Sequence, residues 1–222
     1  MKYFKKIAVV GLAAASLGLA DSLEEVLARM DRAAKDFRSV TASVKKIDFT
    51  AVLNESTTSA GSLAMRRTKN GNEVLVKFSE PDPYVLHLSG HIARKYSPRA
   101  NTVEDYPSNK LAAAEKMMLL GFGVSASDLR KDYDIKLIVA ENVGSVHATR
   151  IELTPKSADV RKNYAEKIEL WIDGQANKIQ EKWSTPSKDY YQVTYSDLKV
   201  NPALRDSDFE LNLPPGVREL HP

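Results

Sequence analysis

The segment from Gly61 to Pro98 constrains the fold more than any other part of the chain. It contains four strand-length runs in which apolar and polar residues alternate, and Gly, Pro, Asn or Asp ends each run. This pattern is typical of an antiparallel meander with short hairpin turns. Its apolar face would consist of Leu63, Met65, Val74, Val76, Phe78, Tyr84, Leu86 and Leu88. Such a face must be covered, and what covers it decides the function.

The flanking patterns predict helices and further strands. A capping box from Ser22 to Glu25 opens a helix whose apolar stripe runs to Phe37, and this stripe should lie on the sheet. A second helix should begin at Ser108 and end at Gly121. We also expect a strand over 40–53, a polar loop over 54–59 and a short helix over 127–133. Further strands are expected over 102–106, 134–139, 147–153, 166–172, 178–183 and 190–195.

About ten strands joined mostly in sequence, with few helices, predict a mainly β (α+β) fold. Because twist accumulates from strand to strand, a long antiparallel sheet curls into a barrel or half-barrel. The interior of such a barrel need not be filled by its own side chains. The two longer helical segments would then form a plug or lid, and residues 21–222 should form a single domain.

The first twenty residues have the pattern of a secretory signal peptide. Lys2, Lys5 and Lys6 precede an apolar run, and Gly18 to Ala20 offers the small residues that signal peptidase requires. The run is shorter than the roughly 20 residues that span a bilayer, so a cleaved leader is favoured over an uncleaved anchor. We therefore expect export to the periplasm, with cleavage after Ala20.

Removing the leader also changes the charge balance. The chain has 32 Lys and Arg residues and 29 Asp and Glu residues, and the leader holds three of the lysines and no acidic residue. The remaining chain is formally neutral, which gives no electrostatic reason to expect nucleic acid as a partner. The chain has no cysteine, which excludes disulfides, thiolate metal sites and a lipid anchor on a cysteine.

Motifs of enzymes and metal sites are missing from the sequence. The four histidines have no zinc-ligand spacing, no Gly-x-Ser-x-Gly elbow is present, and Gly121 to Gly123 is too short for a phosphate loop. Acidic pairs such as Glu80 with Asp82 lie in turn-like contexts, where solvated carboxylates are normal. We therefore expect no enzymatic activity, no cofactor and no metal.

Several segments together resemble the LolA family of periplasmic lipoprotein carriers. They include 61–67, the extended run that ends in 78–81, Ser89-Gly90 followed by 96–98, then 153–155, 168–173 and the ending 209–217. The likeness covers the whole chain after the leader. The chain departs from the family pattern at Thr68, where proline is common, and at Val76, which replaces a tryptophan.

The resemblance implies an incomplete antiparallel β-barrel, or half-barrel, with a helical lid, and a hydrophobic cavity that holds acyl chains. The candidate residues for its wall are Leu63, Met65, Val74, Val76, Phe78, Leu86, Leu88, Met117, Met118, Ile168 and Leu170. Arg67 matches the family's arginine that holds the lid by hydrogen bonds. From composition alone, a solvated arginine in a hairpin is the alternative for Arg67.

Methionines occur on the predicted meander and helices, at Met30, Met65, Met117 and Met118. Their flexible thioethers suit a wall that adapts to varied chains, although ordinary core filling is the alternative for each.

The resemblance also implies partners. These are acylated lipoproteins as cargo, an inner-membrane complex that releases them and an outer-membrane lipoprotein that accepts them, with the carrier itself a monomer. Two alternatives remain open: a lipid-binding sensor or regulatory module of the same fold, and a carrier of another lipid. An esterase would need a nucleophile and base that the sequence does not show.

Overall fold

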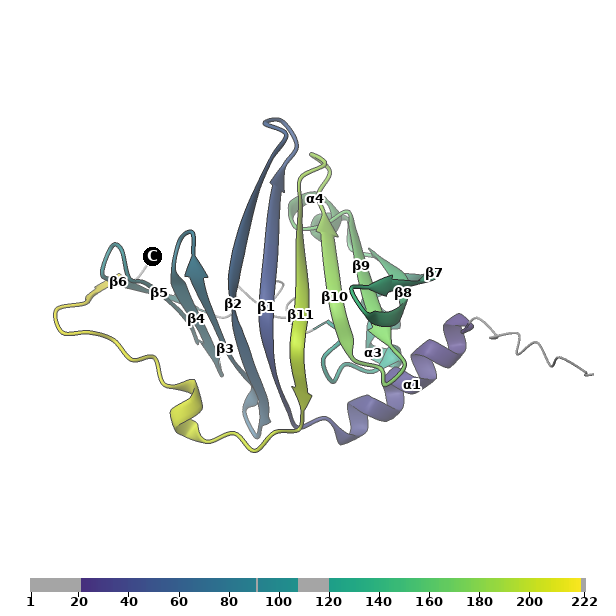
Figure 1. Cartoon of the computed structure of the whole chain (residues 1–222), viewed down its shortest axis with the longest axis horizontal. Coiled ribbons are helices and arrows are strands. Elements are labelled where there is room, and N and C mark those ends of the chain that lie inside the picture. The colour runs from purple at the N-terminus through teal and green to yellow at the C-terminus, as the bar shows by residue number, and fades with distance from the viewer. Residues whose placement is uncertain (1–20, 91, 108–119, 221–222) are drawn as a thin grey trace, which may run out of the picture.

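The structure is a computed structural model that describes residues 21–90, 92–107 and 120–220. Twelve strands form one sheet, in the order β12-β6-β5-β4-β3-β2-β1-β11-β10-β9-β8-β7. The strands are β1 (Ser39–Thr50), β2 (Glu55–Thr68), β3 (Gly71–Glu80), β4 (Tyr84–Ser89), β5 (Ile92–Ser97), β6 (Thr102–Pro107), β7 (Tyr133–Val143), β8 (Val146–Pro155), β9 (Lys167–Asp173), β10 (Lys178–Ser184), β11 (Tyr190–Val200) and β12 (Arg218–Leu220). Figure 1 shows a strongly curved sheet, which confirms the predicted mainly β fold.

The sheet is antiparallel except at one edge, where β12 pairs in parallel with β6. The expected meander is β2 to β5, whose strands pair with their neighbours in sequence. The pairing of β1 with β11 joins this meander to the second run of strands, β7 to β11. The sheet therefore consists of two meanders that meet along β1 and β11.

Within the described residues, three α-helices and one 3-10 helix accompany the sheet: α1 (Leu23–Asp36), α3 (Ala126–Asp132), α4 (Ala158–Asn163) and η1 (Asp206–Phe209). The predicted capping box is present at the start of α1. The backbone N–H of Ser22 donates to Glu25 Oε2 at 2.7 Å, and the N–H of Glu25 donates to Ser22 Oγ at 3.3 Å. These bonds satisfy backbone donors that have no partner inside the helix.

The apolar stripe of α1 packs against β8, β9 and β10 in what we call the helix-covered cluster. Ile168, Leu170 and Ile172 alternate along β9 and are fully buried in it, as their predicted shared face requires. The cluster consists of Val26, Leu27, Met30, Leu120, Ala126, Leu129, Tyr133, Ile151, Leu153, Ala165, Ile168, Leu170, Ile172, Ala176 and Trp183. It fills the concave side of this half of the sheet.

A second group, the meander cluster, covers the concave side of the other half. It consists of Phe37, Val40, Ala42, Val44, Leu63, Met65, Val74, Val76, Phe78, Leu88, Ala93, Phe122, Val193 and Tyr195, with Tyr84 and Leu86 partly buried against it. The apolar face predicted from the meander is therefore correct. Tyr191 packs against both clusters and marks the boundary between them.

The convex side of the meander is partly covered by the C-terminal segment, which runs from β11 past η1 to β12 (Figure 1). Phe209 of η1 is buried, and the guanidinium of Arg66 lies 4.5 Å from the centre of its ring. Arg66 also forms ion pairs with Glu73 at 2.6 Å and with Asp206 at 2.7 Å. These contacts hold the segment against β2 and β3.

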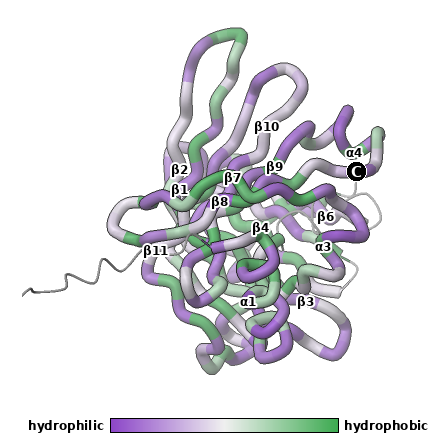
Figure 2. Tube along the Cα trace, turned by 90° about the vertical axis from the view of Figure 1, so that its right-hand side faces the viewer, coloured by the Kyte–Doolittle hydropathy of each residue, from purple (hydrophilic) through white to green (hydrophobic). Residues whose placement is uncertain are grey.

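The predicted loop over 54–59 is wrong, because β2 already begins at Glu55 and pairs with β1. The turn lies at 51–54, where Asn54 adopts a positive φ of 53°. This part of β2 carries Ser and Thr on both faces of the strand. It therefore lacks the alternation of apolar and polar residues that marks a half-buried strand. In Figure 2 the hairpin projects beyond the neighbouring strands, and its tip carries Val52 and Leu53, which are 89% and 62% exposed.

Other elements lie outside the sequence predictions or outside the described residues. The short helix α4 and the edge strand β12 were not predicted. The predicted helix from Ser108, including Met117 and Met118, and the predicted leader over 1–20 lie outside the described residues. Among the helices of the described residues, none is long and apolar enough to cross a membrane.

Leu170→Ala tests the helix-covered cluster. Leu170 is fully buried beneath α1, and its truncation should lower the free energy of unfolding by about 2–5 kcal/mol, measured by urea denaturation. Val52→Ala, at the exposed hairpin tip, should change it by no more than about 0.5 kcal/mol. Equal effects of the two substitutions would contradict the packing described here.

Candidate functional site

A cavity of about 360 Å³ lies on the concave side of the sheet. Its lining residues are Val44, Lys46, Leu63, Met65, Val74, Val76, Phe78, Tyr84, Phe122, Asn163, Tyr164, Glu181, Trp183, Tyr191, Val193 and Tyr195. The lining is mostly aliphatic and aromatic, with few polar groups. Its volume and composition are those of a site for a small, largely apolar ligand.

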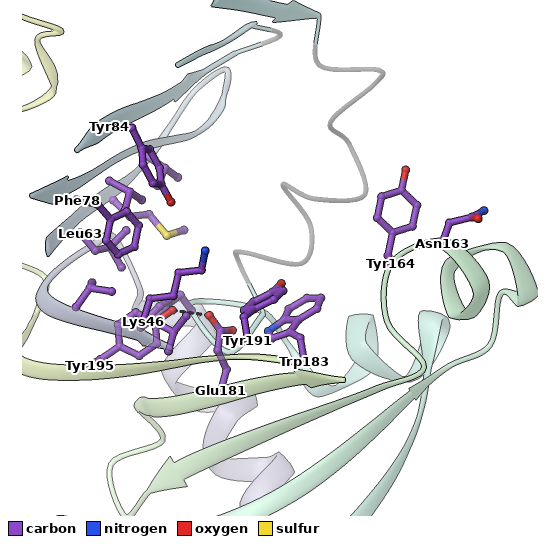
Figure 3. Close-up of a pocket in the computed structure, with 16 residues that line it drawn as sticks. Lys46, Leu63, Phe78, Tyr84, Asn163, Tyr164, Glu181, Trp183, Tyr191 and Tyr195 are labelled. Atoms are coloured by element: carbon purple, nitrogen blue, oxygen red, sulfur yellow. Dashed lines mark hydrogen bonds between the residues drawn. The ribbon is translucent and has the colours of Figure 1, made fainter. Parts of the chain in front are cut away.

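The wall comes from strands of both halves of the sheet. In β2 and β3, side chains two residues apart, such as Leu63 and Met65, point to the same side because strand residues alternate between faces. Figure 3 shows Phe78 and Tyr84 on one side of the cavity and Trp183 and Tyr191 on another. The cavity therefore lies where the meander cluster meets the helix-covered cluster.

Asn163 and Tyr164, at the end of α4, are separated from the other lining residues. Figure 3 shows both residues across the space from the strands that carry Leu63, Phe78 and Tyr84. Tyr164 is 39% exposed, so it lies at an opening to solvent. The cavity is thus bordered on this side by the C-terminal end of a helix of six residues.

Lys46 brings a positive charge to the edge of the cavity. Its Nζ lies 2.8 Å from Asp48 Oδ1 and 6.0 Å and 5.8 Å from the ring centres of Phe78 and Tyr191. Figure 3 shows the ammonium group extending between the two walls. The aliphatic stem of a lysine can line an apolar cavity while its charged end stays paired.

A buried ion pair lies in the wall formed by β10. Lys178 Nζ lies 2.8 Å from Glu181 Oε2, and the Tyr195 hydroxyl donates to Glu181 Oε1 at 2.6 Å. Each carboxylate oxygen therefore accepts a hydrogen bond. Lys178 is 0% exposed and Glu181 is 3% exposed, so pairing is needed to offset the loss of hydration.

Burial perturbs the titration of these groups. Burial lowers the pKa of Lys178, and the nearby charge of Glu181 acts in the opposite direction. Burial, followed by the charge of Glu181, raises the pKa of Tyr195 well above its usual value. Tyr195 therefore remains a protonated donor to Glu181 at neutral pH.

The ion pair also supports the segment that follows residue 119. Lys178 Nζ lies 4.3 Å from the ring centre of Phe122, and Phe122 packs edge-on against Tyr195 with ring centres 5.1 Å apart. A Cβ at Gly121 would lie 3.0 Å from the Lys178 side chain. The chain thus passes directly over the buried lysine, and Phe122 becomes part of the cavity wall.

Arg67 holds the same segment from the other side. Its Nη2 donates to the carbonyl oxygen of Gly123 at 2.8 Å, and its Nη1 donates to the carbonyl oxygen of Ala34 at 3.4 Å. The guanidinium also lies 5.7 Å from the ring centre of Phe37. Arg67 therefore links β2, the end of α1 and the segment at Gly123, and it is not a freely solvated hairpin arginine.

Gly123 fits this arrangement because it has no side chain. It adopts a φ of +64°, and a Cβ there would lie 2.4 Å from Phe37 Cδ1 and 3.0 Å from Arg67 Nη2. The close approach of the backbone lets the arginine reach the carbonyl.

The structure brings together only part of the predicted cavity wall. Leu63, Met65, Val74, Val76 and Phe78 line the cavity. Leu88 is buried in the meander cluster and Leu86 packs against it, but neither is among the lining residues.

Ile168 and Leu170, also predicted for the wall, lie elsewhere. Both are fully buried in the helix-covered cluster, because α1 occupies that half of the concave side. Met30 lies in the same cluster. Met117 and Met118 lie outside the described residues.

Sequence reasoning missed the aromatic and charged part of the wall, which comprises Lys46, Glu181, Trp183, Tyr191 and Tyr195. The spacing of four of them in the sequence could have indicated a shared strand face. Glu181 with Trp183, and Tyr191 with Tyr195, lie at even spacings in predicted strands and so share a face. Nothing in the sequence distinguishes the buried Lys178 from a lysine on a solvated strand.

No group of three or more His, Asp or Glu side chains suited to holding a metal ion occurs among the described residues. His87 Nε2 lies 3.2 Å from Glu73 Oε1, and His147 Nδ1 lies 3.1 Å from Asn142 Oδ1. Both histidines thus take part in local polar contacts.

No protein-family model matches the chain, and no curated protein matches it. Solved structures do match. An uncharacterized conserved protein from Thermus thermophilus matches with a TM-score of 0.57 at 11% identity, covering 90% of this chain and 98% of that one. A chain of the Pseudomonas aeruginosa MucA/MucB complex matches with a TM-score of 0.51 at 14% identity, covering 85% of this chain and 60% of that one.

A LolA superfamily protein from Nitrosomonas europaea is also matched, with a TM-score of 0.41 and 14% identity over 86% of this chain and 98% of that one. At these identities the likeness concerns the fold alone. The chain shares its fold, a large curved antiparallel sheet with few short helices, with the Thermus thermophilus protein and with the matched chain of the MucA/MucB complex.

Lys178→Met tests the buried ion pair. It leaves Glu181 buried without its cation, so the free energy of unfolding should fall by about 3–5 kcal/mol in urea denaturation. The double substitution Lys178→Met/Glu181→Gln removes both charges and keeps an acceptor for Tyr195, so it should cost less than the single one. A double variant less stable than Lys178→Met would refute this account of the pair.

Arg67→Leu tests the link to Gly123. The fold should persist, while amide hydrogen exchange over 121–124 should accelerate about tenfold because two hydrogen bonds are lost. Arg66→Leu is the matched control, since Arg66 lies on the opposite face and pairs with Glu73. Exchange over 121–124 that is unchanged in Arg67→Leu, or equally fast in both variants, would show that Arg67 does not hold this segment.

Proposed function

We propose that this chain is a periplasmic carrier that shields the acyl chains of lipoproteins and moves them from the inner to the outer membrane. The observation that carries the proposal is the apolar cavity of about 360 Å³ on the concave side of the sheet. A well-packed small domain has few voids of this size. A cavity lined by aliphatic and aromatic side chains suits hydrocarbon.

The energetics of acyl chains explain why a carrier is needed. Moving hydrocarbon from water into an apolar site is worth about 0.8 kcal/mol for each methylene group. A chain that buries a dozen methylenes would therefore gain about 10 kcal/mol, and it cannot cross an aqueous space unshielded. Aromatic side chains such as Phe78, Tyr84 and Tyr191 would provide much of the contact area.

A carrier must also release its cargo, and Arg67 is suited to control this step. It joins β2 to the end of α1 and to the segment at Gly123 through two hydrogen bonds to carbonyl oxygens. Phe122, next to Gly123, lines the cavity. Breaking these two bonds would free the segment, so we assign Arg67 the role of a latch between closed and open cavity.

In this proposal residues 1–20 are a cleavable signal peptide and residues 21–222 are a single carrier domain. The carrier acts as a monomer. It receives cargo from an inner-membrane release complex and delivers it to an outer-membrane acceptor lipoprotein. The formally neutral chain after residue 20 gives no general attraction to nucleic acid.

A regulatory module that binds another envelope protein is the second candidate. The match to a chain of the MucA/MucB complex favours it, because that structure shows a protein of this fold in a complex with a protein partner. The two candidates differ in what occupies the cavity, since a carrier must hold an acyl chain there during transfer.

Val76→Asp tests the carrier function. Val76 lines the cavity, and a carboxylate there would lie against the acyl chain, so binding of a fluorescent triacylated lipopeptide should weaken at least about tenfold. Lys77→Asp places the same charge at an exposed position on the other face of the same strand and should change affinity less than about twofold.

The same pair of variants serves in a release assay with spheroplasts. Wild-type protein and Lys77→Asp should release lipoprotein into the medium, and Val76→Asp should not. Wild-type protein that neither binds the lipopeptide nor releases lipoprotein would rule out the carrier and leave the regulatory module.

A further inference from the structure

Trp183 presents a hydrogen-bond donor that has no acceptor among the described residues. Its side chain is 1% exposed and lines the cavity, and its Nε1 is buried without a partner. In Figure 3 the indole nitrogen lies on the edge of the ring that is turned toward Glu181. An indole N–H can only donate, and buried donors in proteins nearly always have an acceptor.

The other tryptophan of the chain shows what a satisfied indole looks like in this fold. Trp171, on the opposite face of the sheet, donates from Nε1 to Glu141 Oε1 at 2.7 Å. Of the two indoles, the one that lines the cavity is therefore the one whose N–H lacks an acceptor among the described residues.

Two tyrosines add further donors to the cavity. Tyr191 stacks on Trp183 with ring centres 5.4 Å apart, and Tyr84 lies across the cavity from it (Figure 3). Burial raises the pKa of Tyr84 to about 12, and burial also raises the pKa of Tyr191 far above its usual value. Both hydroxyls therefore stay protonated at neutral pH and can donate.

The carboxylate of the wall, Glu181, already has a partner at each oxygen. Glu181 accepts from Lys178 at one carboxylate oxygen and from Tyr195 at the other. Lys46, at the rim, is a further donor and is paired with Asp48. A ligand with an acceptor oxygen would therefore satisfy the free donor of Trp183 in the cavity.

We infer that the cavity binds an acyl ligand through its carbonyl oxygen, which accepts a hydrogen bond from Trp183 Nε1 while the hydrocarbon chain lies against the aliphatic wall. This inference rests on the proposed function, because it specifies the chemical group of the cargo that the site recognises. The oxygen belongs to an ester- or amide-linked acyl chain or to the carboxylate of a free fatty acid.

Two lipids that differ only at this group provide the test. Myristoyl-lysophosphatidylcholine has an ester carbonyl, and its tetradecyl ether analogue has the same head group and carbon chain length without one. Wild-type protein should bind the ester about threefold to tenfold more tightly, as expected for one neutral hydrogen bond. In Trp183→Phe the two affinities should become equal within about twofold, because any packing loss affects both lipids alike and only the ester loses the hydrogen bond.

A second measurement on wild-type protein avoids any loss of stability in the variant. The indole N–H signals of Trp183 and Trp171 can be followed by two-dimensional NMR, with Trp171→Phe to assign them. The ester should shift the Trp183 signal downfield, the ether should shift it much less, and Trp171 should stay unchanged as the internal reference. Myristate, tested in parallel, shows whether a free carboxylate gives the same shift.

The outcomes separate this inference from the proposed function. A carbonyl-dependent shift of Trp183 with the ester or with myristate supports the inference and identifies the source of the oxygen. Equal binding of ester and ether lipid by the wild type, with equal Trp183 shifts, overturns the inference while leaving the carrier function intact. Failure to bind any of the three lipids also overturns the inference, and it overturns the carrier function as well if the triacylated lipopeptide is not bound either.

Discussion

The architecture depends on the packing of α1 against one half of the curved sheet. The helix buries its apolar stripe on β8, β9 and β10 and fills the concave side there with aliphatic side chains such as Leu27 and Ile168. A helix of 14 residues is about 21 Å long, so it covers only part of a twelve-stranded sheet. The cavity lies next to the covered part, between β1 to β4 and β10 to β11.

A buried ion pair lies where the cavity meets the part of the sheet that α1 covers. Burying an ammonium or a carboxylate costs its hydration free energy. Lys178 and Glu181 offset this cost by pairing with each other, and Tyr195 donates to the second carboxylate oxygen. The ammonium of Lys178 also packs against the ring of Phe122, and Arg67 donates a hydrogen bond to the carbonyl oxygen of Gly123. Two cations thus position a segment of a few residues that helps close an apolar cavity.

Sequence patterns predicted which face of each strand is apolar but not what covers that face. The alternation in 61–88 predicted the meander cluster correctly, and the capping box at Ser22 predicted the start of α1. The alternation at Ile168 and Leu170 was equally clear, yet these residues pack under α1 and not around the cavity. Periodicity is a local property, whereas the position of a helix on a sheet depends on contacts distant in sequence.

The polar features of the site were harder to predict for a related reason. Lys178 and Glu181 have the composition of a solvated strand, and only their neighbours in space, Phe122 and Tyr195, show that they are buried. The start of β2 is rich in Ser and Thr, a composition that predicts a loop. It is a strand whose side chains are mostly exposed, so the apolar alternation of a half-buried strand is missing. The role assigned to Arg67 came from resemblance, and the hydrogen bonds to Ala34 and Gly123 are consistent with it.

The central claim is that the concave cavity holds acyl chains in the cell. Native mass spectrometry of the protein, purified without detergent from the cells that produce it naturally, tests this most directly. The account predicts a population with one bound acyl-containing lipid or lipopeptide for each chain, whose fragments include a fatty acyl group. Protein that consistently carries no acyl-containing molecule, even when prepared from cells that accumulate unsorted lipoproteins, would contradict it.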